Sequence, residues 1–425
     1  MTHPPSLADI AAQLEAYDPQ ALPANEVLNF LDHLVTPVHD SESVDIFAAL
    51  GRVTAQDVIS PLNVPPHDNS AMDGFAFDGA QLRDTQGLSL KVVGTALAGK
   101  AWAGAVNAGE CVKIMTGAIM PEGLNTVVPQ ELCRIAPTDV VAIPAGLLKA
   151  GDNRRLCGED IMQGQPALPK GALVTPAAAG LLASLGVPNV LVVRRLRVAY
   201  FSTGDEILSL GEAPREGAVY DSNRYTVHGM LQALGCEMID MGVVKDEPEL
   251  LEQAFNKAAE QADAIITSGG VSVGEADFTK AMMKKLGDVV FWKIAMRPGR
   301  PMAVGRIQKG QRSAVLFGLP GNPVAVMVTF LAFVKPALLK MMGCTAAPLP
   351  MLRARTQEVL RKKPGRTEYQ RGIVSRNAQG ELQVITTGNQ GSGVLSSMVQ
   401  ANGLIVLSHQ QGTAQLGDWV DVLVL

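Results

Sequence analysis

Residues 262–278 read ADAIITSGGVSVGEADF, an apolar segment that runs directly into a glycine-rich turn. We predict a buried strand over residues 262–267, because β-branched and apolar residues fill it. A glycine-rich turn after a strand usually offers backbone N–H groups to a phosphate. This turn lacks both the Lys-Ser/Thr pair of a P-loop and the spacing GxGxxG. It carries Glu275 and Asp277 instead, two carboxylates that repel an anion unless a cation lies between them.

The segments on either side of this stretch alternate strands with helices. The expected strands and following turns occupy residues 196–206, 289–296 and 313–323, and the expected helices occupy residues 221–234, 246 onward and 279–286. Asp221 or Ser222 suits the N-cap of the first helix, Asp246 that of the second and Asn322 that of a long helix that begins with Pro323. This alternation predicts an α/β/α domain with a mostly parallel sheet that helices cover on both faces.

Three polar or glycine-rich loops follow the strands of the predicted sheet: STGDE (202–206), SGGVSVGEAD (268–277) and GLPGNP (318–323). Each loop alone is most simply an ordinary turn. Loops that follow parallel strands meet at one edge of the sheet, however, where ligands bind. Gly269 and Gly270 let backbone amides approach an anion, and Ser268 and Ser272 add hydroxyl groups. Asp277 suits either a helix N-cap or a Mg²⁺ ligand that bridges to phosphate.

Cations gather near the end of one predicted strand. Lys293 precedes the run RPGRP (297–301), in which prolines stiffen the backbone that carries Arg297 and Arg300. A solvated basic turn is the simplest interpretation, but a forked guanidinium also matches an oxyanion. Because cations are few elsewhere in the chain, we favour an anion site here.

The composition is that of a globular protein with several domains. A chain of 425 residues exceeds one ordinary core, hydrophobic residues make up 47% and charged residues 18%. A net charge of −5 argues against a nucleic-acid partner. The five scattered cysteines fit a reducing cytoplasm. Residues 1–10 do not resemble a signal peptide, and the longest apolar run, residues 324–334, is too short to span a membrane.

The regions outside the α/β domain have their own patterns. Residues 88–143 alternate short Val-rich runs with glycine turns, which predicts a small β domain, and residues 349–425 predict a small β-barrel or sandwich. Helices are expected over residues 7–17, 24–34 and 176–185. Polar loops in these regions contain Asp73, Thr116, Asp160, Arg366, Arg371 and Ser392. Each is unremarkable alone, but polar loops from several regions often meet at a site between domains or subunits.

Nine of these motifs together resemble the MoeA-type molybdopterin molybdotransferases, which are relatives of the gephyrin E domain. The motifs occur in order over nearly the whole chain: NSAMDGFA, KIMTGAIMP, GEDI, STGDE, YDSNRY, SGGVSVGEAD, RPGRP, GLPGNP and TTGNQGSG. The resemblance implies a split, elongated N-terminal domain (1–57 and 146–193), a small β domain (58–145), an α/β molybdopterin-binding domain (194–345) and a C-terminal β-barrel (346–425). It also implies a homodimer whose site is built from both subunits.

The activity that the resemblance implies is insertion of molybdate into adenylylated molybdopterin, with Mg²⁺-dependent release of AMP. A molybdopterin adenylyltransferase and molybdoenzyme maturation proteins are the implied transient partners. Carried over by motif, the implied metal ligands are Asp246 and Asp277. The other implied catalytic residues are Asp73, Thr116, Asp160, Glu206 and Lys293. The implied substrate-binding residues are Ser268, Gly269, Gly270, Ser272, Gly274, Arg297, Arg300, Pro320, Pro323, Arg366, Arg371 and Ser392.

Two other functions compete with this interpretation. A pterin-binding scaffold without turnover is the first, but it would have lost acidic site residues, whereas Asp73, Glu206, Asp246 and Asp277 are all present. A nucleotide-dependent oxidoreductase is the second, and no GxGxxG follows a predicted strand. Both alternatives therefore rank below the molybdotransferase.

Overall fold

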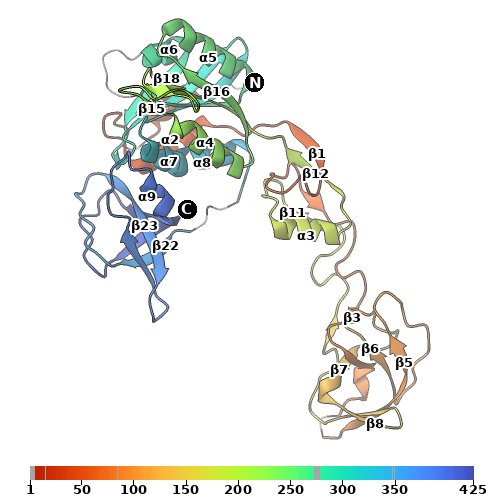
Figure 1. Cartoon of the computed structure of the whole chain (residues 1–425). Coiled ribbons are helices and arrows are strands. Elements are labelled where there is room, and N and C mark those ends of the chain that lie inside the picture. Colours follow the sequence, from red (N-terminus) through yellow and green to blue (C-terminus); the bar gives the residue numbers. More distant parts are fainter. Residues whose placement is uncertain (1–4, 15, 84, 272–277, 347, 349) are drawn as a thin grey trace.

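The computed structural model describes residues 5–14, 16–83, 85–271, 278–346, 348 and 350–425. The molecule is elongated (Figure 1), with an α/β domain and a C-terminal barrel at one end, a narrow arm in the middle and a small β domain at the far end. The chain runs out along the arm and returns along it, so residues 41–70 and 154–193 lie side by side. This path separates the small β domain from the rest of the molecule.

The central sheet has the strand order β16-β13-β17-β21-β20-β18. Its strands are β13 (Arg197–Thr203), β16 (Glu237–Val244), β17 (Ala264–Ser268), β18 (Gly287–Lys293), β20 (Pro301–Lys309) and β21 (Arg312–Leu319). The first four strands in the spatial order are parallel, whereas β20 runs antiparallel to both of its neighbours, β21 and the edge strand β18. The prediction of a mostly parallel sheet is confirmed.

Alternate residues of the central strands enter two separate cores, because side chains alternate between the faces of a strand. Val198 and Tyr200 join one core, and Ala199 and Phe201 join the other. The first face is covered by α1 (Leu7–Ala12), α2 (Ala24–Leu34), α4 (Ser222–Ala233), α7 (Pro323–Thr329), the π-helical segment η3 (Phe330–Val334) and α8 (Lys335–Met341). The second face is covered by α5 (Pro248–Gln261) and α6 (Phe278–Leu286).

Several predicted helix ends differ in the structure. The side chain of Asp221 caps α4 as expected, since it accepts a bond from Arg224 N. Asp246 is not the cap of α5: Glu247 occupies that position, and Asp246 lies one residue outside the helix. Asn322 has the cap position of α7, but its side chain makes no capping bond. The expected helix over residues 7–17 already ends at Ala12.

The predicted strand over residues 289–296 is divided between two sheets. Its first part is β18, whereas its end forms β19 (Met296–Arg297), which pairs with β23 of the C-terminal domain. One run of apolar residues therefore contributes to two domains. Its local sequence pattern is the same as that of a single strand, so the sequence did not reveal the division.

The helix that runs from Pro323 to Met341 is the only one, among described residues, long and apolar enough to cross a membrane. It is longer than the apolar run of residues 324–334 because η3 and α8 continue it. Val324, Phe333 and Leu338 on this helix are fully buried in the core against the sheet. The helix is therefore a core helix of the α/β domain.

Three short antiparallel ladders form the arm. β1 (Ser41–Asp45) pairs with β12 (Asn189–Val193), β2 (Val58–Ile59) with β11 (Pro166–Leu168), and β3 (Asn69–Ser70) with β10 (Arg154–Arg155). Helix α3 (Pro176–Ser184) packs beside them around a small core that contains Val174, Leu182 and Val190. The expected domain segment 1–57 is thus divided in space, since α1 and α2 pack on the central sheet and only the later residues enter the arm.

The small β domain is a sheet with the order β7-β4-β6-β5-β9-β8. Its elements are β4 (Gly74–Phe77), η1 (Gly79–Gln81), β5 (Leu88–Ala96), β6 (Glu110–Ile114), β7 (Thr126–Pro129), η2 (Gln130–Leu132), β8 (Arg134–Ala136) and β9 (Val140–Ile143). Two cores lie on its two faces, and all their residues come from positions 75–148. The domain therefore has hydrophobic cores of its own.

The C-terminal domain is a closed barrel, as predicted. Strands β22 (Leu352–Thr356), β23 (Thr367–Arg376), β24 (Leu382–Thr386), β25 (Gly403–Leu407) and β26 (Trp419–Val424) pair in a ring that the contact between β23 and β25 completes. Helix α9 (Ser396–Gln400) lies in the connection before β25. The short pair β14 (Ile207–Leu208) and β15 (Val219–Tyr220) lies in the α/β domain.

Candidate active site

A cavity of about 810 Å³ lies where the α/β domain meets the C-terminal barrel. Its lining comes from the turns that follow β13, β16, β17 and β21, from the segment 296–301 and from the barrel loop near Ser392. The loops that the sequence predicted to converge therefore do meet. The sequence-predicted residues among the lining are Glu206, Asp246, Gly269, Gly270, Arg297, Arg300, Pro320, Arg366 and Ser392.

The glycine turn after β17 requires its two glycines. Gly269 has φ +92° and Gly270 has φ +63°, a region that side chains other than glycine rarely adopt. A Cβ on Gly269 would lie 2.5 Å from the carbonyl oxygen of Thr203, and a Cβ on Gly270 would lie 2.5 Å from Cβ of Thr279. The turn therefore packs against its neighbours as closely as backbone allows, and its inner wall is bare backbone.

The hydroxyl group of Ser268 lies below this turn and not on the cavity wall. It is 2.7 Å from the Tyr200 hydroxyl and 3.2 Å from that of Ser202, and all three side chains are buried. Burial raises the pKa of Tyr200 well above its ordinary value, so this network stays neutral. Its role in the structure is thus to bind the strand ends together. The predicted residues Ser272, Gly274 and Asp277, and Glu275 with them, lie outside the described residues.

Two carboxylates form an acidic wall. Glu206 and Asp246 both line the cavity, and Thr279 donates a hydrogen bond of 3.0 Å to Oδ1 of Asp246. The backbone N–H of Asp246 lies 3.5 Å from Oδ1 of Asp205. Because Asp246 lies outside α5, its carboxylate is available to the cavity and is held by a buried threonine from α6.

Magnesium suits this wall. In the part of the chain that the structure describes, no group of three His, Cys, Asp or Glu side chains is placed to hold a metal ion. Mg²⁺ usually binds to only one or two carboxylates and completes its shell with water and substrate phosphates. Glu206 and Asp246 beside a bare backbone turn match that pattern, so the donor set fits the ion.

Arginines also line this cavity. Arg297 and Arg300 are both exposed and line the cavity, and Arg366, the residue before β23, lines it as well. Arg366 pairs with the buried Glu368 at 2.7 Å, which neutralises part of its charge. The barrel loop is fixed to the α/β domain here, because Val324 N donates to the Ser392 carbonyl at 3.1 Å. Lys293 and Pro323 are not among the residues that line the cavity.

Arg371 lies next to a second, smaller cavity of about 260 Å³, which also includes Arg297 and Gln390. Its side chain is fully buried and donates to Ser397 Oγ, Asn389 O and Gly391 O at 3.0, 3.3 and 3.0 Å. Burial, with the nearby charge of Arg297, lowers the pKa of Arg371 below its ordinary value. In this structure Arg371 therefore holds the loop that carries Ser392.

Sequence reasoning missed several residues of the cavity. Thr203, Gly204, Asn322 and Gln390 line it without having been singled out as ligand contacts. The hydroxyl of Thr203 is buried without a hydrogen-bond partner among the described residues. The signal for these positions was present, since three of them belong to the loops STGDE and GLPGNP, but which loop side chain faces inward depends on the tertiary structure.

Asp73 directly precedes β4 and Thr116 follows β6 in the small β domain, and Asp160 lies between β10 and β11 of the arm. None of the three lines the cavity, and Figure 1 shows the arm and the small β domain extending away from the α/β domain and the barrel. Asp73 accepts from Thr116 N at 2.7 Å and from Thr116 Oγ1 at 2.8 Å, and these bonds lower the pKa of Asp73. All three side chains are exposed. Asp73 and Thr116 therefore form one polar unit, which a single chain does not bring to the cavity.

Comparisons with known proteins agree with this architecture. Family models described as the MoeA N-terminal region (domain I and II), a probable molybdopterin binding domain and the MoeA C-terminal region (domain IV) match residues 22–186, 199–340 and 353–425. The crystal structure of the molybdopterin biosynthesis moeA protein from Pyrococcus horikoshii OT3 has a TM-score of 0.79 at 27% identity, over 96% of this chain and 100% of that chain.

Curated relatives are similar over nearly their whole length. A molybdopterin molybdenumtransferase of Haemophilus influenzae is 42% identical over 393 residues, which is 92% of this chain and 95% of that protein. The molybdopterin molybdenumtransferase of Nostoc sp. is 36% identical over 415 residues, 95% of this chain and 92% of that protein. The order of the domains, the cavity between two of them and these similarities lead to one conclusion: the chain belongs to the MoeA family of molybdopterin molybdenumtransferases.

Proposed function

We propose that this chain inserts molybdenum from molybdate into adenylylated molybdopterin and releases AMP in a Mg²⁺-dependent step. The observation that carries the proposal is the composition of the cavity lining, in which a bare glycine turn and two carboxylates share one cavity with three arginines. A nucleotide–pterin pyrophosphate and the tetrahedral molybdate dianion are bound by different kinds of protein group. Backbone N–H groups and a metal suit the pyrophosphate, and forked guanidinium groups suit the dianion.

The proposed roles follow from position. Gly269 and Gly270 would present backbone to the pyrophosphate, and Pro320 with the start of α7 at Pro323 would shape the cleft beside it. Arg297, Arg300 and Arg366 would hold molybdate, with Ser392 beside them and Lys293 nearby. Arg371 would act by fixing the loop of Ser392, given the bonds that its guanidinium makes.

Asp246 would hold the Mg²⁺ ion together with Asp277 and with Glu206 beside them. When bound, the ion supplies positive charge that stabilises the departing AMP phosphate. In the reaction, a water molecule or a molybdate oxygen attacks the pyrophosphate link, and the P–O bond that breaks leaves its electron pair on AMP. The two dithiolene thiols then form two Mo–S bonds, and their two protons leave with one molybdate oxygen as water, without a change in the oxidation state of molybdenum.

AMP release by the purified protein is the direct test. Full-length protein is mixed with adenylylated molybdopterin, molybdate and Mg²⁺, and AMP is quantified by chromatography. We expect turnover with wild type and a loss of about a hundredfold or more with Asp246→Asn, as for removal of a group that stabilises transition-state charge. Asp288→Asn, on the surface of β18, is the matched control and should release AMP at the wild-type rate. Wild-type protein without AMP release would rule the proposal out.

A non-catalytic scaffold that binds molybdopterin is the alternative. It predicts that adenylylated molybdopterin binds, as measured by calorimetry, without AMP release at any molybdate or Mg²⁺ concentration. The carboxylates of Glu206 and Asp246 on the cavity wall favour the enzyme, because two negative charges beside a phosphate site weaken binding unless a metal ion lies between them.

We also infer a cytoplasmic homodimer in which Asp73, Thr116 and Asp160 reach the cavity of the partner chain. Transient contacts with a molybdopterin adenylyltransferase and with molybdoenzyme maturation proteins follow from the same substrates. We infer a shared site because Asp73, Thr116 and Asp160 do not line the cavity of their own chain and belong to the small β domain and the arm, which extend away from it.

Mixed dimers test this arrangement. Asp73→Asn and Arg297→Ala chains, each with its own affinity tag, are co-expressed, and the mixed dimer is purified through both tags. Each pure variant should be nearly inactive, whereas the mixed dimer contains one intact site and should recover about half of the wild-type rate per dimer. A mixed dimer as inactive as its parents would contradict a site shared between subunits.

A further inference from the structure

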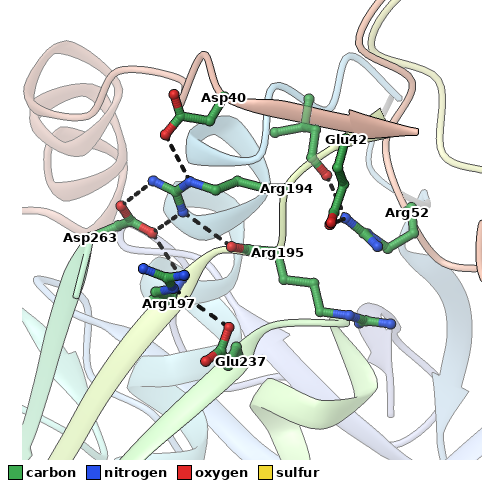
Figure 2. A network of polar contacts seen from close by, with 9 residues as sticks. Asp40, Glu42, Arg52, Arg194, Arg195, Arg197, Glu237 and Asp263 are labelled. Atoms are coloured by element: carbon green, nitrogen blue, oxygen red, sulfur yellow. Dashed lines mark hydrogen bonds and ion pairs between the residues drawn. The ribbon is translucent and has the colours of Figure 1, made fainter. Parts of the chain in front are cut away.

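The base of the arm is joined to the α/β domain by one arginine (Figure 2). Arg194 lies between β12 of the arm and β13 of the central sheet. Its NH1 and NH2 groups donate to the two carboxylate oxygens of Asp263, both at 2.7 Å. Its Nε donates to Asp40 Oδ2 at 2.9 Å, and its backbone N–H donates to the Asp40 carbonyl at 3.0 Å. One side chain thus ties the outgoing chain of the arm to the start of β17.

The two carboxylates hold different parts of the molecule. Asp263 directly precedes β17, and its Oδ2 also accepts from Arg197 N at 2.8 Å, so it is fixed to the central sheet. Its side chain is 18% exposed, and that of Arg194 is 24% exposed. Asp40 directly precedes β1, and its side chain is 75% exposed. The contact with Asp263 is therefore the fixed half, and the contact with Asp40 is the half that holds the arm.

Further close contacts at the same junction limit the rotation of the arm. Arg195 NH1 donates to the Gly235 carbonyl at 2.8 Å, and a Cβ on Gly235 would lie 3.2 Å from the carbonyl of Gly51. Across the junction, Thr345 N donates to the carbonyl of Gly171 at 2.9 Å. Each of these further contacts ends on a backbone carbonyl. Arg194 instead forms ion pairs with two carboxylates, Asp40 and Asp263, and we call these three residues the Arg194 cluster. The hydrogen bonds to Asp263 raise the pKa of Arg194 above its ordinary value, which keeps the cluster charged at all physiological pH.

We propose that Arg194 is a positioning residue for the molybdenum transfer: it fixes the direction of the arm and thereby the place at which Asp73, Thr116 and Asp160 are presented. A small rotation at the base of the arm produces a displacement that grows along the arm, past Asp160, and is largest in the small β domain, which contains Asp73 and Thr116. The proposal rests on the proposed function and on the shared site. Displacement of a catalytic group by about 1 Å is enough to lower turnover by up to about a hundredfold.

Asp40→Asn is the sharpest test, because it weakens only the contact to the arm and leaves the pair of Arg194 with Asp263 in place. Arg194→Gln removes both contacts, and the double variant Arg194→Gln with Asp263→Asn also removes the negative charge of the half-buried Asp263, which Arg194 no longer balances. Arg197→Gln is the matched control: Arg197 lies three residues after Arg194, at the start of β13, and its ion pair is with Glu237 of β16 at 3.6 Å and not with the arm. We expect this control to behave as wild type.

Two measurements separate positioning from a structural role. Spin labels on non-canonical residues at Glu122 of the small β domain and Lys257 of α5, in chains diluted with unlabelled protein, report the direction of the arm. We expect a broader distance distribution in Asp40→Asn and broader still in Arg194→Gln. The kcat of AMP release should fall about tenfold or more while the KM values for molybdate and the pterin nucleotide stay within about twofold, since the cavity is intact. Arg194→Lys keeps the charge but not the fork, and should recover only part of kcat.

The outcomes distinguish this inference from the proposed function. A broader arm distribution with unchanged kcat would overturn the positioning role and leave the molybdotransferase intact. If the distance distribution between the spin labels is unchanged in Arg194→Gln and in the double variant, Arg194 does not fix the direction of the arm and the inference is wrong. No AMP release by wild type would remove the proposed function and with it the kinetic role of Arg194.

Discussion

At the scale of single residues, the candidate site depends on how one threonine holds one aspartate. Thr279 is fully buried, and its hydroxyl donates to Asp246 at 3.0 Å. Thr279→Val keeps the shape but loses the donor, so we expect AMP release to fall about tenfold and stability to fall by about 1 kcal/mol. Steady-state assays and urea unfolding measure the two effects. Thr279→Ser keeps the hydroxyl and should retain most of the activity; equal losses in both variants would contradict the role of this bond.

Gly270 tests whether the close packing of the glycine turn matters beyond its backbone angle. Gly270 has φ +63° and its Cβ would meet Thr279, whereas Gly310 has φ +61° with open space around it. We expect Gly310→Ala to cost about 1 kcal/mol through backbone strain alone, and Gly270→Ala to cost about 1–3 kcal/mol more with loss of activity. Chemical unfolding compares the two variants. Equal costs would mean that the turn moves away without penalty.

At the scale of structural elements, the buried guanidinium of Arg371 binds two carbonyl groups of the barrel loop of residues 388–392, in addition to the bonds that the Gln390 side chain makes. Arg371→Lys has too few donors in the right directions to replace the bonds to Asn389, Gly391 and Ser397. We expect a loss of about 2–3 kcal/mol and faster amide hydrogen exchange in this loop, with weaker molybdate binding as its consequence.

The control lies on the same strand. Arg376, at the exposed end of β23, donates to the Gly380 carbonyl at 2.7 Å, also a bond to backbone. Arg376→Lys should change stability by less than about 0.5 kcal/mol, because water replaces an exposed bond. Hydrogen exchange that is unchanged in Arg371→Lys would show that the loop is held by other contacts.

At the scale of the whole molecule, the small β domain should be removable. Its cores draw only on residues 75–148, and Ser70 and Arg154 are paired neighbours at its base. We expect a chain in which Asn-Gly replaces residues 71–153 to fold with its main unfolding transition shifted by no more than about 3 °C, because two-residue turns of this type suit antiparallel strands. Differential scanning calorimetry measures the shift.

The shortened chain also tests the division of labour between the ends of the molecule. It keeps the cavity and should bind molybdate as wild type does, but it lacks Asp73 and Thr116 and should not release AMP. Loss of the main unfolding transition in the shortened chain would show that the small β domain stabilises the rest of the molecule. Full AMP release would exclude any catalytic role for that domain.

Local patterns in the sequence predicted most elements because they depend on nearby residues. Continuous runs of apolar and β-branched residues before polar turns predicted β13 and β17, and the capping residue Asp221 predicted the start of α4. The prediction failed where two interpretations share one pattern. Asp246 followed by Glu247 and Pro248 fits a helix start at either acid, and the run 289–296 does not reveal that its end pairs with another domain.

The sequence by itself determined the central sheet, the barrel and the family, because periodicity, turn chemistry and nine ordered motifs are properties of the chain. Only the tertiary structure decided which members of those motifs meet. It brought Glu206, Asp246, the glycines and the arginines to one cavity, turned Ser268 and Arg371 into the interior, and carried Asp73, Thr116 and Asp160 away on an arm. The physical reason is that side-chain direction and domain placement depend on contacts distant in sequence, such as that of Arg194 with Asp40 and Asp263, which local pattern does not encode.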